Sequence, residues 1–530
     1  MTLSFKHRAA TALAAAACGA AAGLAHPPFG FLPGLLGWAG LLWLLDRADG
    51  ARPLKSAFWR GWWMGVGYFL VGTWWVAEAF LVDAASHGWM APFAVMLLPA
   101  GMGLFWGLAS LGYVRLGTRG PARVLTFTVL FSLIEWVRGW FLTGFPWNLP
   151  GETWAAGSAI SQNASVFGVF GLTFLTIAIV ASVAALAGPG RWRTRLIAPV
   201  LGLATLAGMY GYGHFRLESA SNRTTGLVVR IVQPDVDQKD KWRPENLPEI
   251  VDDYVRLSRS PGAEKVDVLF WPEGALPAII DQLLAPGSPY ADRIISSLSP
   301  GQTLFMGANR LGGTPEEPTY HNSVVVLRRE ADATRVAGVY DKHHLLPFGE
   351  YLPLGELMTR LGVRSLVHMP ADYTPGPPPR PLTLTGLPPV QILICYESIF
   401  PNLIGKGPVR PEWIVVPSND SWFGETSGPW QHLNVGTYRT LEQGLPMVRS
   451  TPTGISAVID PYGRTATGHR LEPDAIGVID APLPAALPPT VYSRWGEIPF
   501  WALIVFGAAV ALLFGHTGQK RRDSQALTNL

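Results

Sequence analysis

Long apolar stretches occupy the first two hundred or so residues of the chain and return near its C-terminus. A helix that crosses a bilayer needs about 20 mostly apolar residues. The stretches that approach this requirement are 9–25, 31–45, 61–80, 90–114, 124–140, 165–186, 196–212 and 498–515. The pattern therefore predicts a membrane α-helical bundle of about eight transmembrane helices.

Between residues 226 and 480 the pattern changes to short β-rich runs that alternate with helix-length segments. Several runs are apolar throughout, which is typical of strands in a sheet that is covered on both faces. The predicted strands are 227–232, 266–271, 303–307, 323–327, 336–340, 390–395, 413–417, 447–450, 455–460 and 475–479, and the predicted helices are 247–258, 290–298 and 431–443. The segment 312–318 is predicted to be a loop. This alternation predicts a layered α/β domain.

The two patterns divide the chain into three parts. Residues 1–220 are predicted to form a transmembrane bundle of seven helices, residues 221–485 the α/β domain, and residues 486–530 a last transmembrane helix with a basic tail. The alternative for 9–25 is a cleaved signal peptide, since a basic start precedes small residues. We favour a retained helix because six further spans follow it before the α/β domain.

The distribution of Lys and Arg predicts the orientation in the membrane, because cytoplasmic loops accumulate these residues. The loops 81–89 and 141–164 contain none of them. The terminal segments and the alternate loops do, at Lys6, Arg8, Arg47, Arg52, Lys55, Arg115, Arg119, Arg123, Arg191, Arg193, Arg195, Lys520, Arg521 and Arg522. Eight spans with both termini in the cytoplasm fit this alternation. The α/β domain is then expected outside the cytoplasm.

Composition agrees with a membrane protein, since 48% of the residues are hydrophobic and only 15% are charged. The net charge of +3 is too small to suggest binding to nucleic acid. Two cysteines, Cys18 and Cys395, give no disulfide framework. Within the predicted spans, Glu135 and Arg138 are three residues apart and are expected to pair on one helix face, or else to position lipid or an active-site loop.

Ionisable residues follow three of the predicted strands. Glu273 comes after 266–271, Lys342 after 336–340, and Cys395 closes 390–395. A thiol, a carboxylate and an ammonium together are the parts of an activated cysteine nucleophile, in which the cation is expected to lower the thiol pKa. A buried cysteine alone is more often a small apolar residue, but the three strand ends occur together. The adjacent His343 and His344 have no partner at ligand spacing, so no metal site is predicted.

The motifs around these residues resemble those of the carbon–nitrogen hydrolase (nitrilase) superfamily. They are Trp-Pro-Glu at 271–273, Lys-His-His at 342–344 with Pro-Phe-Gly-Glu-Tyr at 347–351, and Cys-Tyr-Glu at 395–397. With membrane spans on both sides, the chain looks like the bacterial apolipoprotein N-acyltransferases, as do Ser-Asn-Asp-Ser-Trp-Phe-Gly at 418–424 and Arg-Ser-Thr-Pro-Thr-Gly at 449–454. The resemblance implies an αββα sandwich for residues 221–485.

The resemblance also implies roles for individual residues. Cys395 would be the nucleophile, Glu273 the general base, and Lys342 the group that stabilises the oxyanion. Supporting residues would be Glu350, Tyr396 and Glu397. Residues that could contact lipid or substrate, or else pack in the core, are Trp242, Trp422 and Phe423.

The activity that the resemblance implies is transfer of an acyl chain from a membrane phospholipid to the N-terminal amine of a diacylglyceryl-cysteine apolipoprotein, through a thioester on Cys395. No cofactor is implied. The expected location is the bacterial inner membrane, with a periplasmic catalytic domain. The alternatives are a membrane-tethered nitrilase-type amidase and a transporter with an inert soluble domain. Seven preceding spans would be superfluous for the amidase, and a transporter predicts more polar residues inside the spans.

Overall fold

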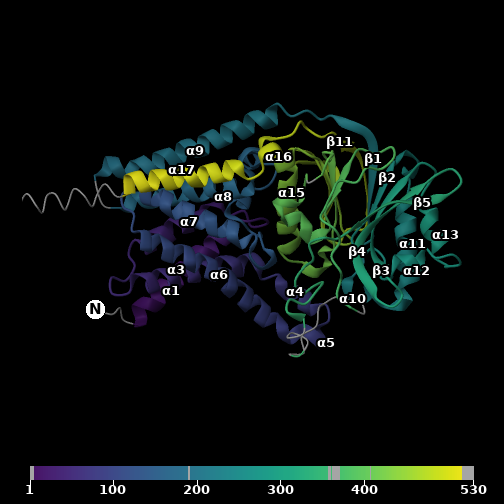
Figure 1. Ribbon diagram of the computed structural model, residues 1–530, viewed down its shortest axis with the longest axis horizontal. Coiled ribbons are helices and arrows are strands. Elements are labelled where there is room, and N and C mark those ends of the chain that lie inside the picture. Colours follow the sequence, from purple (N-terminus) through teal and green to yellow (C-terminus); the bar gives the residue numbers. More distant parts are fainter. Residues whose placement is uncertain (1–4, 189–190, 356–359, 361–370, 406, 516–530) are drawn as a thin grey trace, which may run out of the picture. The chain divides into compact units, whose positions relative to one another are not determined.

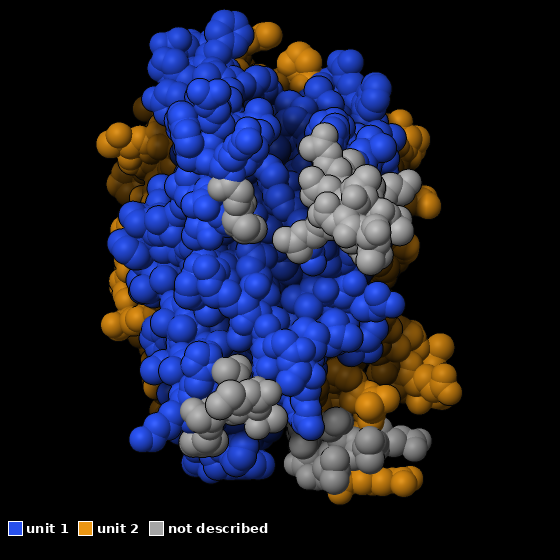
Figure 2. All heavy atoms as spheres, turned by 90° about the vertical axis from the view of Figure 1, so that its left-hand side faces the viewer, with its two compact units in different colours: residues 1–220, 430–442, 489–530 blue, residues 221–429, 443–488 orange. Residues whose placement is uncertain are grey.

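The computed structural model describes residues 5–188, 191–355, 360, 371–405 and 407–515. The chain forms two compact units, which are coloured separately in Figure 2. Unit 1 contains residues 1–220, 430–442 and 489–530, and unit 2 contains residues 221–429 and 443–488. The basic residues predicted at 520–522 lie outside the described part of the chain.

Unit 1 is helical (Figure 1). Its α-helices are α1 (Phe5–Gly23), α2 (Gly37–Leu45), α3 (Pro53–Thr73), α4 (Val76–Leu81), α5 (Ala84–His87), α6 (Ala91–Leu116), α7 (Ala122–Arg138), α8 (Ala164–Ser182), α9 (Trp192–Glu218), α16 (Val491–Trp495) and α17 (Ile498–Gly515), with most of α15 (Gly428–Gln443). Within the described residues, four helical stretches can cross a membrane by length and composition, namely Ala84–Leu116, Ile160–Ala187, Trp192–Glu218 and Ile498–Gly515. The larger count of about eight stays a prediction.

The third predicted span differs from the helix that forms. The prediction began at residue 61, after Arg60, but α3 begins at Pro53 and ends at Thr73. Proline is favoured in the first turn of a helix, where its missing N–H costs nothing. Arg60 is tolerated inside the helix because its buried guanidinium donates to the Leu44 carbonyl at the C-terminal end of α2. A charged residue therefore did not mark the start of this helix.

Small residues allow α3 and α6 to pack closely. A Cβ added to Gly65 would lie 2.6 Å from the Cα of Gly103, so only glycine fits at this crossing. Close backbone approach at small residues is typical of helices that associate in membranes. Beside this contact, Trp38, Trp106 and Phe131 form an aromatic cluster in the core of unit 1.

Glu135 and Arg138 form a fully buried ion pair on α7, which confirms the predicted pairing. The Nη2 atom of Arg138 lies 2.5 Å from a carboxylate oxygen of Glu135. Trp106 donates its indole N–H to the same carboxylate at 2.7 Å. Arg138 also donates to the carbonyl oxygens of Phe145 and Trp147. Because both charges have several partners, the pair ties the end of α7 to the chain that follows it.

Most of α15 belongs to unit 1 and is fixed there by buried hydrogen bonds. The side-chain oxygen of Gln431 accepts from the indole N–H groups of Trp75 at 3.1 Å and Trp147 at 2.9 Å. Near the other end of the helix, Glu442 accepts from the backbone N–H of Val169 at 2.9 Å. These bonds join a helix from the last fifth of the sequence to segments in its first third.

The described part of unit 2 contains two β-sheets. The six-stranded sheet has the order β11-β1-β2-β3-β4-β5 and the five-stranded sheet the order β10-β9-β8-β7-β6. The strands are β1 (Thr224–Gln233), β2 (Val268–Trp271), β3 (Thr303–Gly313), β4 (Pro318–Arg329), β5 (Thr334–Asp341), β6 (Val390–Ile392), β7 (Trp413–Pro417), β8 (Met447–Ser450), β9 (Ser456–Ile459), β10 (Thr465–Leu471) and β11 (Gly477–Pro484). The central strands β1, β2 and β3 are parallel, as are β6, β7 and β8.

The two sheets pack face to face through apolar side chains that include Phe270, Phe305 and Trp413. The outer face of the six-stranded sheet is covered by α11 (Leu247–Ser258), α12 (Ile280–Leu283) and α13 (Ala291–Ser296) (Figure 1). Unit 2 therefore contains a helical layer and two sheets of the predicted αββα sandwich. The helix that follows β7 in the chain, α15, lies mainly in unit 1.

Several strands differ in their bounds from the prediction, and three of the differences matter for the site or the topology. The strand β10 was missed because its polar, largely exposed residues show no apolar pattern. The predicted loop 312–318 is shorter, because backbone pairing of β3 with β4 continues to Gly313 and Pro318. Finally, β6 ends at Ile392, three residues before Cys395.

Candidate active site

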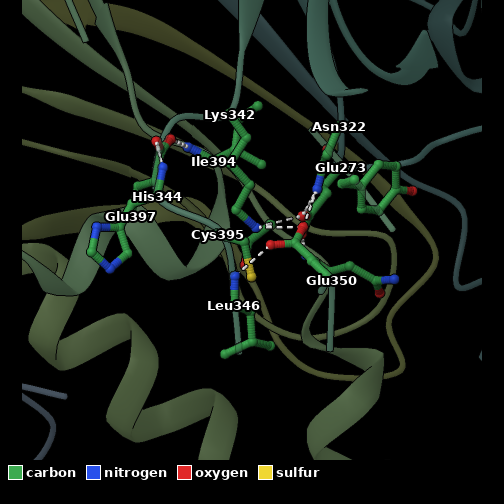
Figure 3. Close-up of polar contacts among 12 residues, drawn as sticks. Glu273, Asn322, Lys342, His344, Leu346, Glu350, Ile394, Cys395 and Glu397 are labelled. Atoms are coloured by element: carbon green, nitrogen blue, oxygen red, sulfur yellow. Dashed lines mark hydrogen bonds and ion pairs between the residues drawn. The ribbon is translucent and has the colours of Figure 1, made fainter. Parts of the chain in front are cut away.

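Three strands bring the predicted triad residues to one place in unit 2. Lys342 directly follows β5, and Glu273 lies two residues after β2, so both extend from the six-stranded sheet. Cys395 lies three residues after β6 of the five-stranded sheet. Figure 3 shows the thiol beside the Lys342 ammonium and the carboxylates of Glu273 and Glu350. The prediction that the three strand ends meet is thus matched by the geometry.

Cys395 has an unusual backbone conformation. Its φ is +50°, in the left-handed region that side chains other than glycine rarely adopt, at a cost of roughly 1–3 kcal/mol. It opens the 3₁₀ turn Cys395–Ile399, and the Ser398 hydroxyl donates to its carbonyl at 2.7 Å. The chain therefore leaves the direction of β6 at this turn. The prediction that Cys395 itself ends a strand is therefore corrected: it sits on a strained turn beyond the strand.

The ammonium of Lys342 lies between two carboxylates. Its Nζ is 2.9 Å from Glu350 Oε1 and 3.3 Å from Glu273 Oε1. Asn322, in β4, donates its side-chain N–H groups to the same two oxygens at 2.7 Å each. All four side chains are buried. Each negative charge is therefore matched by short, charge-assisted hydrogen bonds.

The second oxygens of both carboxylates bind backbone N–H groups. Glu273 Oε2 accepts from the N–H of Asn419 at 2.8 Å, and Glu350 Oε2 accepts from the N–H of Leu346 at 2.7 Å. Because each carboxylate is held at both oxygens, its orientation is fixed before any substrate arrives. The geometry suits a base that must take a proton from one defined direction.

Burial dominates the acidity of the thiol. Desolvation and the negative charge of Glu273 raise the pKa of Cys395 to about 12, and they outweigh Lys342 and a hydrogen bond with Ser418, which act in the opposite direction. Lys342 does lower the thiol pKa, as expected, but burial and the charge of Glu273 raise it by more. At neutral pH the resting nucleophile is a thiol, so it must lose its proton when it attacks.

The side chain of Lys342 stays protonated in spite of its burial. Burial alone would lower the pKa of Lys342, but the carboxylates of Glu350 and Glu273 outweigh it and raise the pKa well above its ordinary value. Lys342 is therefore a permanent cation beside the thiol. Such a fixed charge can stabilise an oxyanion without reorganising during the reaction.

Glu397 has a structural position rather than a place beside the thiol. Its carboxylate accepts from the backbone N–H of Ile394 at 2.7 Å, and from those of His343 at 2.9 Å and His344 at 3.0 Å. The Tyr340 hydroxyl donates to it at 2.9 Å. Burial raises the pKa of Glu397 in spite of these donors. The residue joins the backbone after Lys342 to the backbone before Cys395.

The other candidates have different surroundings. Tyr396 is buried in an aromatic cluster with Phe400, at 5.1 Å between ring centroids, and with His344, at 5.8 Å. The proposed lipid-contact residues Trp242, Trp422 and Phe423 are all half-buried. Their role as lipid contacts stays a prediction.

Three polar residues near the site were missed by sequence reasoning. Asn322 lies inside an apolar strand, where no pattern singles it out. Asn419 and Ser418 follow β7 and were noted only as part of a family motif. The signal that could have found Ser418 and Asn419 is a polar residue directly after a buried parallel strand.

Two family models match this chain, one in each of its two main parts. Residues 18–182 match the family model described as apolipoprotein N-acyltransferase N-terminal domain, and residues 228–487 match the one described as carbon-nitrogen hydrolase. Among solved structures, an amidase from Nesterenkonia sp. is similar over 53% of this chain and 97% of its own, with 20% identity and a TM-score of 0.33. The NitFhit protein of C. elegans is similar over 56% of this chain and 65% of its own, with 15% identity and a TM-score of 0.35.

Curated relatives extend over nearly the whole chain. The apolipoprotein N-acyltransferase of Caulobacter vibrioides is 51% identical over 93% of this chain and 92% of its own length. Those of Brucella melitensis and Rhodopseudomonas palustris are each 37% identical over 95% of this chain and 95% of their own length. Identity of this extent in both parts of the chain shows that the protein belongs to the apolipoprotein N-acyltransferase family.

Proposed function

We propose that this protein transfers an acyl chain from a membrane phospholipid to the N-terminal amine of a diacylglyceryl-cysteine apolipoprotein. The observation that carries the proposal is the Lys342–Glu273 ion pair at 3.3 Å beside the thiol of Cys395, in a chain of this family. A thiol, a fixed base and a fixed cation are what covalent acyl transfer requires. The roles of all three residues are part of the proposal.

In the first step, Cys395 Sγ attacks the ester carbonyl of the phospholipid. Glu273 takes the thiol proton as the S–C bond forms, which a thiol with a pKa of about 12 requires. Lys342 stabilises the negative oxygen of the tetrahedral intermediate, together with the backbone N–H of Tyr396. The ester C–O bond then breaks, and Glu273 returns the proton to the leaving oxygen of the lysophospholipid.

In the second step, the amine of the apolipoprotein attacks the thioester. Glu273 accepts a proton from the amine nitrogen, the C–S bond breaks, and the proton returns to Cys395. The same base therefore serves both half-reactions, in a ping-pong sequence. No cofactor enters either step. Water must be kept from the thioester, because hydrolysis would make the protein a phospholipase.

The location of the site follows from its substrates. Both are lipids confined to a membrane leaflet, so a membrane-anchored site meets them at high effective concentration. We propose that residues 1–220 cross the bacterial inner membrane seven times, that residues 486–530 cross it once more, and that both termini are cytoplasmic. The catalytic domain at 221–485 would then face the periplasm, as the absence of Lys and Arg from the loops 81–89 and 141–164 suggests.

A mass measurement on the intact protein tests the proposal. Full-length protein in detergent micelles is incubated with phosphatidylglycerol, and the mass of a fatty acid minus water should be added at Cys395. Addition of a synthetic diacylglyceryl-cysteine peptide should remove this mass and yield an acylated peptide. Cys395→Ala should show neither event.

The outcomes separate the alternatives. A wild-type protein that gains no acyl group, or a Cys395→Ala protein that still acylates the peptide, contradicts the proposal. Hydrolysis of a small soluble amide without acyl transfer to the peptide would instead indicate a nitrilase-type amidase. A protein that moves a solute across vesicles and forms no adduct would be a transporter.

A further inference from the structure

A second lysine, Lys241, lies buried next to the proposed general base. It ends the short helix α10 (Gln238–Lys241), and only 2% of its surface is exposed. A Cβ added to Gly274, the residue after Glu273, would lie 3.7 Å from the Nζ of Lys241. The ammonium is therefore close to the Glu273–Gly274 peptide, and it plays no part in the two steps described above.

The ammonium of Lys241 forms no hydrogen bond or ion pair with any residue that the structure describes. The hydrogen bonds of Glu273 come instead from Lys342, Asn322 and the backbone N–H of Asn419. Lysine is rarely buried without a partner, since an unpaired charge loses its hydration. The ammonium therefore lies next to the proposed general base without an acceptor among the described residues.

The position of Lys241 is fixed by its own turn. Asp237 caps α10, because its side chain accepts from the backbone N–H of Lys239 at 2.9 Å. Gln238 is buried, and its side-chain oxygen accepts from the side-chain N–H of Asn419 at 3.0 Å. Asn419 in turn binds Glu273 through its backbone. The turn that carries Lys241 is thus joined to the site through Asn419.

We propose that Lys241 binds the phosphodiester group of the acyl donor. The inference rests on the proposed function, in which the donor is a phospholipid. Of the groups that take part in that reaction, the phosphodiester is the one that brings a permanent negative charge into the site. A lysine ammonium is a common phosphate ligand and acts as a compact point charge. Lys342 would then stabilise the oxygen of the ester carbonyl, and Lys241 would bind the phosphodiester of the same molecule.

The state of the ammonium agrees with this role. Burial lowers the pKa of Lys241 to about 8, although the negative charge of Glu273 acts in the opposite direction. Lys241 is therefore mostly protonated at pH 7 before an anion binds. Binding of a phosphodiester would restore the charge partner that burial removes.

The test compares two acyl donors that differ in the phosphodiester. Phosphatidylglycerol in mixed micelles carries one, whereas p-nitrophenyl octanoate lacks it and still acylates a reactive thiol. The variant is Lys241→Met, which keeps the length of the side chain and is compatible with burial. The matched control is Lys239→Met, which removes the same charge from an exposed position on the same turn. Acylation of Cys395 is followed by intact mass in full-length protein.

We expect Lys241→Met to slow acylation by phosphatidylglycerol at least about tenfold, as loss of a charge-assisted hydrogen bond does. Its rate with p-nitrophenyl octanoate should stay within about twofold of wild type, which also shows that the site is folded. Lys239→Met should match wild type with both donors. Lys241→Arg, which keeps the charge, should retain most of the phosphatidylglycerol rate.

Two results would overturn the inference. If Lys241→Met slows both donors equally while Lys241→Arg restores both, the lysine acts on Glu273 rather than on phosphate. If Lys241→Met slows neither donor, the ammonium has no role in donor binding. Failure of the proposed function is a separate result, because wild-type protein would then gain no acyl group from phosphatidylglycerol.

Discussion

Lys342 and Asn322 bind the same two carboxylate oxygens. Lys342 reaches Oε1 of Glu350 and of Glu273 at 2.9 and 3.3 Å, and Asn322 reaches the same atoms at 2.7 Å each. The amide thus stands next to the ammonium as a neutral second donor. The two carboxylates that share a single cation therefore also share a second donor.

Replacement of Asn322 by leucine should slow thioester formation by about ten- to a hundredfold. Each hydrogen bond to a charged group is worth roughly 1.5–3 kcal/mol, and this variant leaves Lys342 as the main donor to both oxygens. Asn322→Asp should be slower still, because it adds a third negative charge. Single-turnover acylation followed by intact mass measures both rates. A rate for Asn322→Leu within twofold of wild type would show that the amide is dispensable.

Replacement of Glu397 by glutamine should mainly reduce stability. The glutamine side chain would set an N–H₂ group against backbone N–H groups of residues 343, 344 and 394, at a cost of roughly 3 kcal/mol. Tyr340→Phe is the matched control, since it removes one donor from the same carboxylate and should cost about 1 kcal/mol. Thermal unfolding of the two variants in the same detergent compares them. An unfolding temperature for Glu397→Gln equal to that of Tyr340→Phe would contradict the stabilising role of Glu397 between these backbone segments.

The reactivity of Cys395 should depend on pH in a way that reflects its charged neighbours. In a Cys18→Ala background Cys395 is the remaining thiol, and its alkylation by iodoacetamide should rise with pH well beyond pH 9, since its pKa is raised to about 12. The charge of Glu273 raises this pKa and that of Lys342 lowers it. Glu273→Gln should therefore shift the alkylation profile to lower pH, and Lys342→Met to higher pH. Shifts of the opposite sign would contradict the stated effects of Glu273 and Lys342 on the pKa of Cys395.

The proposed orientation in the membrane predicts which positions react with an impermeant thiol reagent. In a protein without its native cysteines, Pro315→Cys should be labelled from outside intact spheroplasts. A cysteine near residue 120 should be labelled only after lysis, and Arg119→Cys is preferred because Gly120 has a φ of +66°. The reversed labelling pattern would place the catalytic domain in the cytoplasm and exclude the proposed access to its substrates.

The sequence was informative where apolar pattern and backbone geometry coincide. The strand β7 and the helix α11 have the predicted bounds, because each is a sharply delimited run with a buried face. Glu273 and Lys342 could be found because ionisable residues that end apolar strands stand out. Asn322 could not be found in this way. It lies inside a strand, and the apolar residues that follow it determine the pattern that is seen in the sequence.

Other features depend on tertiary contacts that no local pattern encodes. The left-handed φ of Cys395 is held by the turn that Glu397 and Ser398 close, so the strand appeared to continue to the cysteine. The raised thiol pKa depends on burial, which the presence of a nearby lysine did not reveal. The start of α3 before Arg60 likewise depends on a carbonyl from another helix.

The assignment of α15 to the helical unit has a practical consequence for protein production. Tyr438 and Leu441 on this helix are fully buried, in a core that includes Leu149 and Phe170 from the N-terminal region. A fragment that starts near residue 221 would lack those covering side chains and would display apolar surface to the solvent. Attempts to express the hydrolase-like portion by itself should therefore yield insoluble material. The enzyme is better prepared as one intact polypeptide in a lipid-like environment.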